Sequence, residues 1–350
     1  MLSNLNSNLS ENNHPIDVVV AWVDGDDPRL TKKRESYIIS KNLINAAGTN
    51  PAHFASNNEI RYCVLSILKF APFVRNIYIV TDEQDPNIWD DIKAHFPHRL
   101  ESIRIVDHKE IFRDHEDCLP TFNSIAIGNT TWRIDGLSEN YVYFNDDVFL
   151  IREIAPSDWV KEGRPVLRGH WKFPPYFKIF KNKLRRLIHT QLLGNKSYRP
   201  KFSFYLVQWN AAKLLGFRFR FLFNCHTPHV INRKMVERFY SQRPDLLKQN
   251  ISFRFREQNQ FNVTTLANHI ELVNGNRQIS SLNLGYLHPY YSKSEIKKRI
   301  KRCQTDFGVK SICVQNIEKF SSEQQKDIFT LMDNVLGLTS NTKNASKINS

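Results

Sequence analysis

The sequence has no apolar run of the kind that crosses a membrane. No stretch of its 350 residues approaches the roughly 18 uninterrupted apolar residues that a transmembrane helix needs. The N-terminal stretch MLSNLNSNLSENNHP contains neither a basic region nor an apolar one, so it does not have the pattern of a secretory signal. We expect polar, disordered tails at 1–14 and 337–350.

Cysteine is scarce and scattered. The five cysteines form no CxxC pair, and their number is odd. This argues against a disulfide framework and against a zinc knuckle, and it favours a reducing compartment. We therefore expect a cytoplasmic protein, with peripheral contact at the inner face of the cytoplasmic membrane left open.

Glycine-rich phosphate loops are also missing, since neither GxGxxG nor GxxxxGK[ST] occurs. A phosphorylated ligand would then need the other common solution, which is carboxylates with a divalent cation together with arginines.

What the chain does have is an ordinary globular composition and a strong positive charge. Hydrophobic residues make up 41% and charged residues 24%, which is typical of a folded soluble domain. The formal charge is +14, and basic residues crowd 181–220 and 293–302. This distribution suits a polyanionic partner such as nucleic acid, anionic lipid or a phosphorylated substrate, or it is simply a solvated surface.

Four apolar segments, each ending in an aspartate, alternate with helical patterns. The segments are 16–24, which ends in Asp24, 76–82, which ends in Asp82, 102–107, which ends in Asp107, and 141–146, which ends in Asp146. Helical spacing occupies 59–70 and 86–96 between them, the second opening with Pro86. Alternating strands and helices predict an α/β fold with a mainly parallel sheet, in which ligands bind beyond the carboxyl ends of the strands. The alternative is that these aspartates only close the strands as turn formers.

The second half of the chain is more basic and more aromatic. We expect a loop or lid at 170–180, a strand at 217–224, and helices at 232–241, 294–303 and 322–336. The change in character predicts a core at 15–160 and a second portion at 161–336 that packs on it.

Two acidic stretches follow predicted strands. Asn145, Asp146 and Asp147 interrupt the apolar run YVYFNDDVFL, and their oxygens suit Mg²⁺ or Mn²⁺ or else only a turn. Alternation along a strand predicts that one aspartate faces the site and the other serves the turn. The turn after the first strand contains Asp24, Gly25 and Asp26, where glycine permits a tight bend and close approach of a ligand.

Histidines and arginines supply further chemistry. His226 and His229 flank a proline just before a predicted helix, and a neutral histidine is a natural general base, although helix-entry positions explain them equally well. The stretch SFRFREQ predicts a strand with Arg254 and Arg256 on one face, and guanidinium groups suit phosphate oxygens.

Several stretches together resemble the Stealth family. This family includes bacterial capsular polysaccharide phosphotransferases and the catalytic subunit of the animal GlcNAc-1-phosphotransferase that tags lysosomal enzymes. The stretches are IDVVVAWVDGDDP (16–28), the run from 57 to 150 with NNEIRYCVLSILKF, LPTFNSIAI and YVYFNDDVFL, then HTPHVINRKMVERF (226–239), and more faintly SICVQNIEKF (311–320).

The chain also departs from the family pattern. Gly128 and Trp132 stand where the family usually has acidic and histidine residues, and Gln315-Asn316 replaces an Asn-Asp pair. Asn259 and Gln260 replace acidic residues behind the third region. These departures leave the expected fold and reaction class unchanged and bear on sugar and acceptor choice.

The resemblance implies a GT-A, Rossmann-like sheet with helices on both faces and a metal-dependent phosphotransferase. The implied reaction transfers a sugar 1-phosphate from a UDP-sugar to an acceptor hydroxyl, releases UMP and requires Mg²⁺ or Mn²⁺. The implied product is a phosphodiester-linked capsular polysaccharide. The implied partners are the UDP-sugar donor and a polyanionic saccharide acceptor, with capsule-synthesis enzymes and peripheral membrane contact left open.

The resemblance and the residue chemistry together suggest roles for individual side chains. Asp146 or Asp147 holds the cation. Arg256 neutralises phosphate charge, with Arg61 and Arg133 as further candidates, although Arg61 pairs equally well with Glu59 or a strand-end aspartate. The remaining expected roles are acceptor deprotonation or positioning by His229, and substrate binding by Asp24, Gly25, Asp26, Asn123 and His226.

Two competing functions remain open at this point. An ordinary glycosyltransferase on the same fold would attack the sugar carbon and release UDP. A non-enzymatic binder of nucleic acid or membrane would use only the positive charge, but it leaves the strand-end aspartates unexplained because they repel a polyanion. We therefore expect an enzyme and no nucleic-acid partner.

Overall fold

The computed structural model describes residues 15–40, 58–195, 198, 200–280 and 283–338. Its centre is a five-stranded sheet in the order β11-β4-β1-β2-β3. The strands are β1 (Ile16–Ala21), β2 (Ile77–Thr81), β3 (Ile103–Asp107), β4 (Asn140–Asn145) and β11 (His229–Asn232). All neighbours pair in parallel except β11, which runs antiparallel to β4. The order β3-β2-β1-β4 is that of a Rossmann-type sheet, so the predicted α/β class is confirmed.

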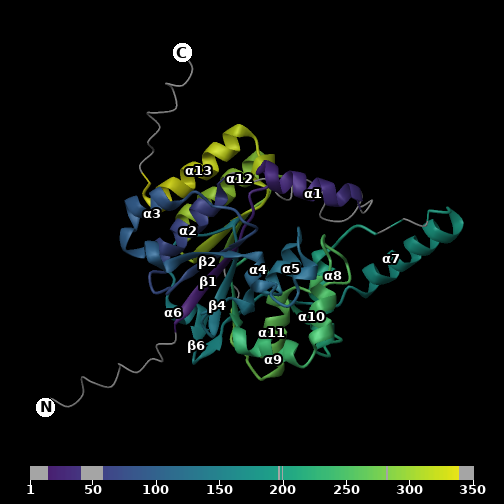
Figure 1. The fold of residues 1–350 in the computed structure, drawn as a ribbon. Coiled ribbons are helices and arrows are strands. Elements are labelled where there is room, and N and C mark those ends of the chain that lie inside the picture. Colours follow the sequence, from purple (N-terminus) through teal and green to yellow (C-terminus); the bar gives the residue numbers. More distant parts are fainter. Residues whose placement is uncertain (1–14, 41–57, 196–197, 199, 281–282, 339–350) are drawn as a thin grey trace.

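Helices cover both faces of this sheet (Figure 1). Val18 and Val20 of β1 belong to one apolar core and Val19 to the other, as alternation along a strand buried on both faces requires. The first core is shared with α2 (Glu59–Phe70), α3 (Trp89–His95), α12 (Lys293–Thr305) and α13 (Ser322–Leu336). The second is shared with α4 (His108–Ile111), α5 (Ser124–Gly128), α9 (Arg233–Ser241), α10 (Pro244–Ile251) and α11 (Val263–Val273).

A second, three-stranded sheet contains β5, the strand that follows β4 in the chain. It has the order β13-β14-β5 and consists of β5 (Val148–Leu150), β13 (Asn283–Leu287) and β14 (Val309–Val314). β14 runs antiparallel to β5, with Cys313 opposite Val148. Residues more than 150 positions apart in the sequence therefore pair directly after the turn formed by Asn145, Asp146 and Asp147. Strand β11, from the second half of the chain, likewise pairs with β4 of the main sheet.

The remaining elements are short or peripheral. They are α1 (Pro28–Ser40), α6 (Pro156–Trp159), α7 (Tyr176–Leu187), α8 (Phe204–Leu214), β6 (Val160–Lys161), β7 (Arg164–Pro165), β8 (Leu167–Arg168), β9 (His170–Lys172), β10 (Phe221–Phe223) and β12 (Ile279–Ser280). Among the described residues, no helix combines the length and apolarity that crossing a membrane requires.

Most predicted elements are confirmed. The first predicted strand, 16–24, ends already at Ala21, so Asp24 lies beyond it, and four further predictions need correction. The helices at 59–70 and 322–336 have the expected ends, and those at 232–241 and 294–303 differ by one or two residues. The predicted helix at 86–96 begins only at Trp89. The loop predicted at 170–180 is instead strand β9 followed by the first turns of α7, since a proline pair just before a helix starts it rather than breaks it.

The other two corrections concern strands. The strand predicted at 217–224 is confirmed only at Phe221–Phe223, where β9 offers a partner. The strand predicted at 252–258 is wrong, because that segment is a series of bends and turns whose backbone oxygens are bound by Asn123. The predicted boundary near 160 stays a prediction.

One buried carboxylate ties the ends of three strands together. Asp17 of β1 is fully buried and accepts two hydrogen bonds from Arg75, at 2.9 and 2.5 Å. It also accepts from the backbone N–H groups of Asn76, at 3.1 Å, and Ser138, at 2.7 Å, which lie just before β2 and β4. A buried carboxylate is tolerated only with such partners.

Replacing Asp17 with alanine removes all four of these bonds and leaves polar groups without partners. We expect Asp17→Ala to lower the free energy of unfolding by about 3 kcal/mol, measured by urea denaturation. Asp90→Ala is the matched control, because Asp90 is fully exposed and should cost less than about 1 kcal/mol. Equal losses in the two variants would contradict this account.

Candidate functional site

The strand-end aspartates do not all behave alike. Asp82 forms an ion pair with Lys33 of α1, at 2.7 Å. Asp107 caps α4 by accepting from the N–H of Lys109 at 2.8 Å, and it accepts from the N–H of Glu83 at 3.0 Å. For these two aspartates the turn-forming and pairing interpretation accounts for the side chain.

The turn after β1 is held by its own hydrogen bonds. Asp24 Oδ1 accepts from the N–H of Asp26 at 3.0 Å, and Gln84 bonds both the N–H and the carbonyl of Asp24 at 2.9 Å. The carbonyl of Gly25 accepts from Thr31 Oγ1 at 3.0 Å. Asp26 is exposed and Asp24 partly exposed, so both carboxylates remain reachable from solvent. Substrate binding by this turn stays a prediction.

Asp146 and Asp147, in the turn between β4 and β5, are different. No lysine or arginine within the described part of the chain forms an ion pair with either carboxylate. Although part of each residue remains accessible, desolvation and the neighbouring carboxylates Asp147 and Glu59 raise the pKa of Asp146 well above its usual range. Desolvation raises the pKa of Asp147 to about 6.

The two oxygens of Asp147 have unequal surroundings. Oδ2 accepts a weak hydrogen bond from the thiol of Cys313 at 3.6 Å, whereas Oδ1 is buried without a partner. A carboxylate oxygen left in this state is costly unless a cation completes it. The donor set therefore fits a divalent cation held by one or two carboxylates together with substrate phosphates, which is how Mg²⁺ is commonly bound. In the described residues no three His, Cys, Asp or Glu side chains gather into an all-protein metal cage.

The antiparallel pairing of β14 with β5 brings the stretch SICVQNIEKF (311–320) to the turn that contains Asp146 and Asp147. Cys313 reaches Asp147, and two residues further on Gln315 Nε2 lies 3.2 Å from His226 Nδ1. Gln315 Oε1 also accepts from the hydroxyl of Tyr286 at 2.7 Å, and the ring of Tyr286 stacks on His226 with centroids 5.4 Å apart. The glutamine that replaces the family asparagine thus orients His226.

The two predicted histidines occupy contrasting positions. His229 begins β11 and is buried, and its Nε2 lies 2.9 Å from the carbonyl of Cys225, which places the proton on Nε2. Its Nδ1 is buried without a partner, and burial lowers the pKa of His229 to about 4. His226 is exposed, and desolvation followed by the charge of His288 lowers its pKa less. Both imidazoles are neutral near pH 7.

Arg256 is the cation whose charge acts on Asp147. It lies in the loop after α10, donates to Ser124 Oγ at 3.0 Å and sits over the ring of Phe204. Burial lowers the pKa of its guanidinium, and the nearby Tyr143 and Asp147 oppose this shift. The geometry thus places a partly desolvated guanidinium near the carboxylate pair without a direct ion pair.

Asn123 holds the loop that carries Arg256. The residue is fully buried, and its Nδ2 donates at 2.9 Å to the carbonyls of Phe253 and Phe255 and to Gln260 Oε1. Its Oδ1 accepts from the N–H of Ile125, which caps α5. These bonds saturate the amide, so the structure gives Asn123 a positioning role; direct substrate contact stays a prediction. Gln260, a departure from the family pattern, takes part in the same network.

Two predicted phosphate-binding arginines have structural partners. Arg61 makes two hydrogen bonds to Asp91 of α3, at 2.7 and 2.6 Å. Arg61 therefore has a structural ion pair, but its partner is neither Glu59 nor a strand-end aspartate. Arg133 donates to the carbonyl of Arg113 and to Asp114 at 3.2 Å. Arg254, expected beside Arg256, instead bonds the hydroxyl of Tyr37 and the carbonyl of Asp117. Phosphate contact by Arg61 and Arg133 stays a prediction.

Sequence reasoning missed several residues of this site. Tyr143, Tyr286 and Cys313 surround the carboxylates, and Ser124 holds Arg256. Three of these residues lie in stretches that carry the family resemblance: Tyr143 in the same run as the aspartates, Ser124 in LPTFNSIAI and Cys313 in SICVQNIEKF. Tyr286 lies in none of these stretches, and its place beside Asp147 depends on the pairing of β13 with β14 and of β14 with β5.

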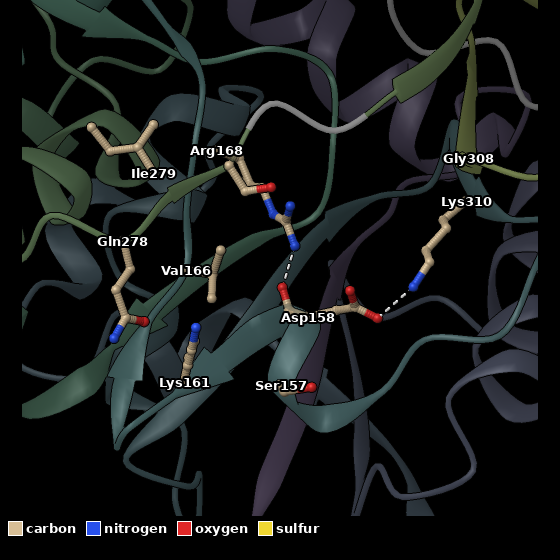
Figure 2. Close-up of a pocket in the computed structure, with 10 residues that line it drawn as sticks. Ser157, Asp158, Lys161, Val166, Arg168, Gln278, Ile279, Gly308 and Lys310 are labelled. Atoms are coloured by element: carbon tan, nitrogen blue, oxygen red, sulfur yellow. Dashed lines mark hydrogen bonds and ion pairs between the residues drawn. The ribbon is translucent and has the colours of Figure 1, made fainter.

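A separate cavity of about 570 Å³ opens beside β6, β8 and the start of β14. Figure 2 shows Asp158 between Arg168 and Lys310; Lys310 lies 2.7 Å from the carboxylate and Arg168 donates to the backbone carbonyl. None of the predicted site residues lines this cavity. The charge of Arg168, which lines the cavity, contributes to the low pKa of His229.

Comparison with known proteins finds two matches to family models. Residues 14–41 match Stealth protein CR1, conserved region 1, and residues 53–168 match Stealth protein CR2, conserved region 2. The resemblance noted in the sequence is confirmed over these two regions.

Curated relatives point to a transferase. A capsular polysaccharide phosphotransferase of Haemophilus influenzae is 28% identical over 90% of this chain and 82% of its own length. An exopolysaccharide phosphotransferase of Streptomyces coelicolor is 29% identical over 88% of this chain and 48% of its own. One of Lactiplantibacillus plantarum is 42% identical over 42% of this chain and 40% of its own. The chain thus spans about half or less of the last two relatives.

Two glycosyltransferases are among the solved structures to which this chain is similar. The galactosyltransferase LgtC gives a TM-score of 0.42 at 11% identity, covering 93% of this chain and 96% of that one. The glycosyltransferase GlyE of Streptococcus pneumoniae gives 0.40 at 11% identity, covering 93% and 63%. Likeness at this level transfers no residue role.

The raised pKa of Asp147 makes a testable prediction about stability. A carboxyl whose pKa is higher in the folded state contributes stability that is present below about pH 4 and lost as pH rises through about 6. Asp147→Asn should therefore gain stability relative to the unsubstituted protein between about pH 4 and pH 7, by roughly 1–3 kcal/mol. Urea denaturation in metal-free buffer measures the difference.

The control for this measurement is Asp90→Asn, which makes the same substitution at a fully exposed carboxylate and should change the free energy of unfolding at pH 7 by less than about 1 kcal/mol. Parallel pH curves for the unsubstituted protein and Asp147→Asn would show that the carboxylate is not desolvated.

Proposed function

We propose that this protein transfers a sugar 1-phosphate from a UDP-sugar to an acceptor sugar hydroxyl, with release of UMP, in the synthesis of a phosphodiester-linked capsular polysaccharide. The observation that carries the proposal is the Asp146–Asp147 pair, which is desolvated and forms no ion pair with a lysine or arginine of the described residues. A divalent cation bearing a diphosphate is the partner that would satisfy it. The capsular and exopolysaccharide phosphotransferases among the relatives support the same reaction class.

The residues of the site would divide the work as follows. Asp147, with Asp146, would hold Mg²⁺ or Mn²⁺, which supplies electrostatic stabilisation of the phosphate oxygens. Arg256 lies close enough for its charge to act on Asp147, so it would neutralise negative charge that grows on the phosphoryl group in the transition state. Asn123 and Ser124 would keep this guanidinium in position.

The acceptor side would belong to the histidines. Phosphoryl transfer needs the acceptor hydroxyl oriented for in-line attack on phosphorus and its proton removed. His229 has a fixed tautomer with a free Nδ1 lone pair, but a pKa of about 4 makes it a weak base. His226 is accessible and is oriented by Gln315. We assign proton acceptance to His229 and positioning of the hydroxyl to His226.

The reaction itself is tested with a panel of UDP-sugars, Mg²⁺ and a saccharide acceptor, by separating UMP from UDP chromatographically. We expect UMP, and we expect Asp147→Asn to abolish its release while the fold remains intact. Asp82→Asn is the matched control, because the strand-end carboxylate of Asp82 forms an ion pair with Lys33. This variant should retain most of the activity. Release of UDP would favour the glycosyltransferase alternative, and near-normal turnover of Asp147→Asn at saturating Mg²⁺ would reject the metal role.

The histidine roles are separated by kinetics. His229→Ala should lower kcat by about 10²–10⁴ if His229 accepts the proton. His229→Gln keeps a donor for the carbonyl of Cys225, so it should lower kcat as much while preserving the fold. His226→Ala should raise KM for the acceptor, and exposed His98→Ala should change neither constant. An effect of His229→Gln confined to KM would assign it to binding.

A further inference from the structure

Helix α7 projects from the body of the protein, in contrast to the other long helices (Figure 1). No residue of α7 is buried, and the π-helical turn Ile188–Leu192 that follows is also without buried residues. Helices in globular proteins normally bury an apolar stripe against a core. We call residues 173–193 the α7 arm.

The exposed surface of the arm is largely apolar. Its exposed apolar side chains, with their exposed fractions, are Phe173 81%, Tyr176 56%, Phe177 78%, Phe180 64%, Leu184 45%, Leu187 49%, Ile188 37%, Leu192 78% and Leu193 64%. Phe177, Phe180 and Leu184 follow one another at three- and four-residue spacing, which places them on one face of the helix. A contiguous apolar face of this kind marks an interaction site rather than a solvated surface.

The rest of the helix is cationic. The arm carries Lys178, Lys181, Lys183, Arg185 and Arg186 and no acidic residue. In the described residues none of these five side chains forms an ion pair with a carboxylate. Their positions flank and oppose the apolar face. An apolar face bordered by lysines and arginines is the pattern of a helix that lies in a membrane interface.

The base of the arm is firmly attached, so it is a built feature of the fold. The Tyr176 hydroxyl donates to the carbonyl of Arg218 at 2.7 Å, and Lys178 Nζ donates to Ser203 Oγ at 2.6 Å. Ile179 packs on the cluster of Trp209, Ala212 and Phe221. Next to this base, Phe219 is 85% exposed.

We propose that the α7 arm docks the protein on a membrane surface rich in anionic lipids, with its aromatic and aliphatic face inserted at the level of the headgroups. This goes beyond the transfer reaction, because it concerns where the reaction takes place. A polyanionic saccharide would use the cations but leaves the leucine and isoleucine side chains without a partner. A second copy of this chain is disfavoured, because the arm and the whole chain are positively charged.

The test is flotation of the full chain with vesicles of phosphatidylcholine alone or mixed with phosphatidylglycerol, in the absence of any UDP-sugar. We expect binding to the anionic vesicles only, weakened by salt. The double variant Phe177→Glu/Phe180→Glu should reduce binding about tenfold or more, since it places charge in the apolar face. It should leave UMP release on a short soluble acceptor unchanged.

The matched control is Val273→Glu/Phe307→Glu. It adds the same charge at two apolar residues that are equally exposed elsewhere, 60% and 80%, and should keep vesicle binding. As a second measurement, the fluorescence of Phe177→Trp should shift to the blue on addition of anionic vesicles.

Three results would overturn the proposal: equal losses in the two double variants, no blue shift, or no vesicle binding by the unsubstituted protein. If the arm instead binds a second copy of this chain, light scattering will detect the dimer and vesicle binding will be absent. If it binds a long anionic saccharide, a saccharide-binding assay will detect this and vesicle binding will again be absent. Failure of the transfer reaction would not affect these outcomes, because vesicle binding is measured without substrate.

Discussion

The structure depends on how it accommodates two adjacent carboxylates at the carboxyl end of β4. Burying unpaired charge is costly, and elsewhere in the molecule that cost is offset: Asp17 has Arg75 and two backbone N–H groups, and Asp82 has Lys33. Within the described part of the chain Asp146 and Asp147 form no such ion pair, and desolvation raises the pKa of both carboxyl groups. The cation and diphosphate proposed for this site would relieve that penalty.

The surrounding elements are arranged to keep that site unpaired but near positive charge. The side-chain amide of Asn123 donates to two backbone carbonyls of the loop that carries Arg256. The guanidinium of Arg256 therefore acts on Asp147 electrostatically without forming a direct ion pair. The pairing of β14 with β5 supplies Cys313 to one carboxylate oxygen and leaves the other free. A diphosphate with its cation would enter an environment of low dielectric where each of these charges has a large effect.

The proposed roles of the α7 arm and of the site would suit one another physically. If the protein extends a polysaccharide as proposed, docking at a membrane surface would keep enzyme and acceptor at high local concentration. The arm is attached through Tyr176, Lys178 and Ile179 to the cluster around Trp209 and α8. α8 in turn contributes Phe204, which lies under Arg256, so the arm and the site share one rigid support.

The sequence by itself determined the α/β class, the ends of α2 and α13, and the aspartates at the ends of β2, β3 and β4, because local periodicity and turn chemistry specify these features. Through family resemblance it also predicted roles for Asp147, His229 and Arg256, and these roles stay predictions. Only the tertiary structure decided which aspartates are already paired, that Asn123 is a positioning residue, and that Arg61 and Arg133 bind Asp91 and Asp114. These outcomes depend on side chains from segments far apart in the chain, whose meeting is set by sheet order and packing rather than by any local pattern.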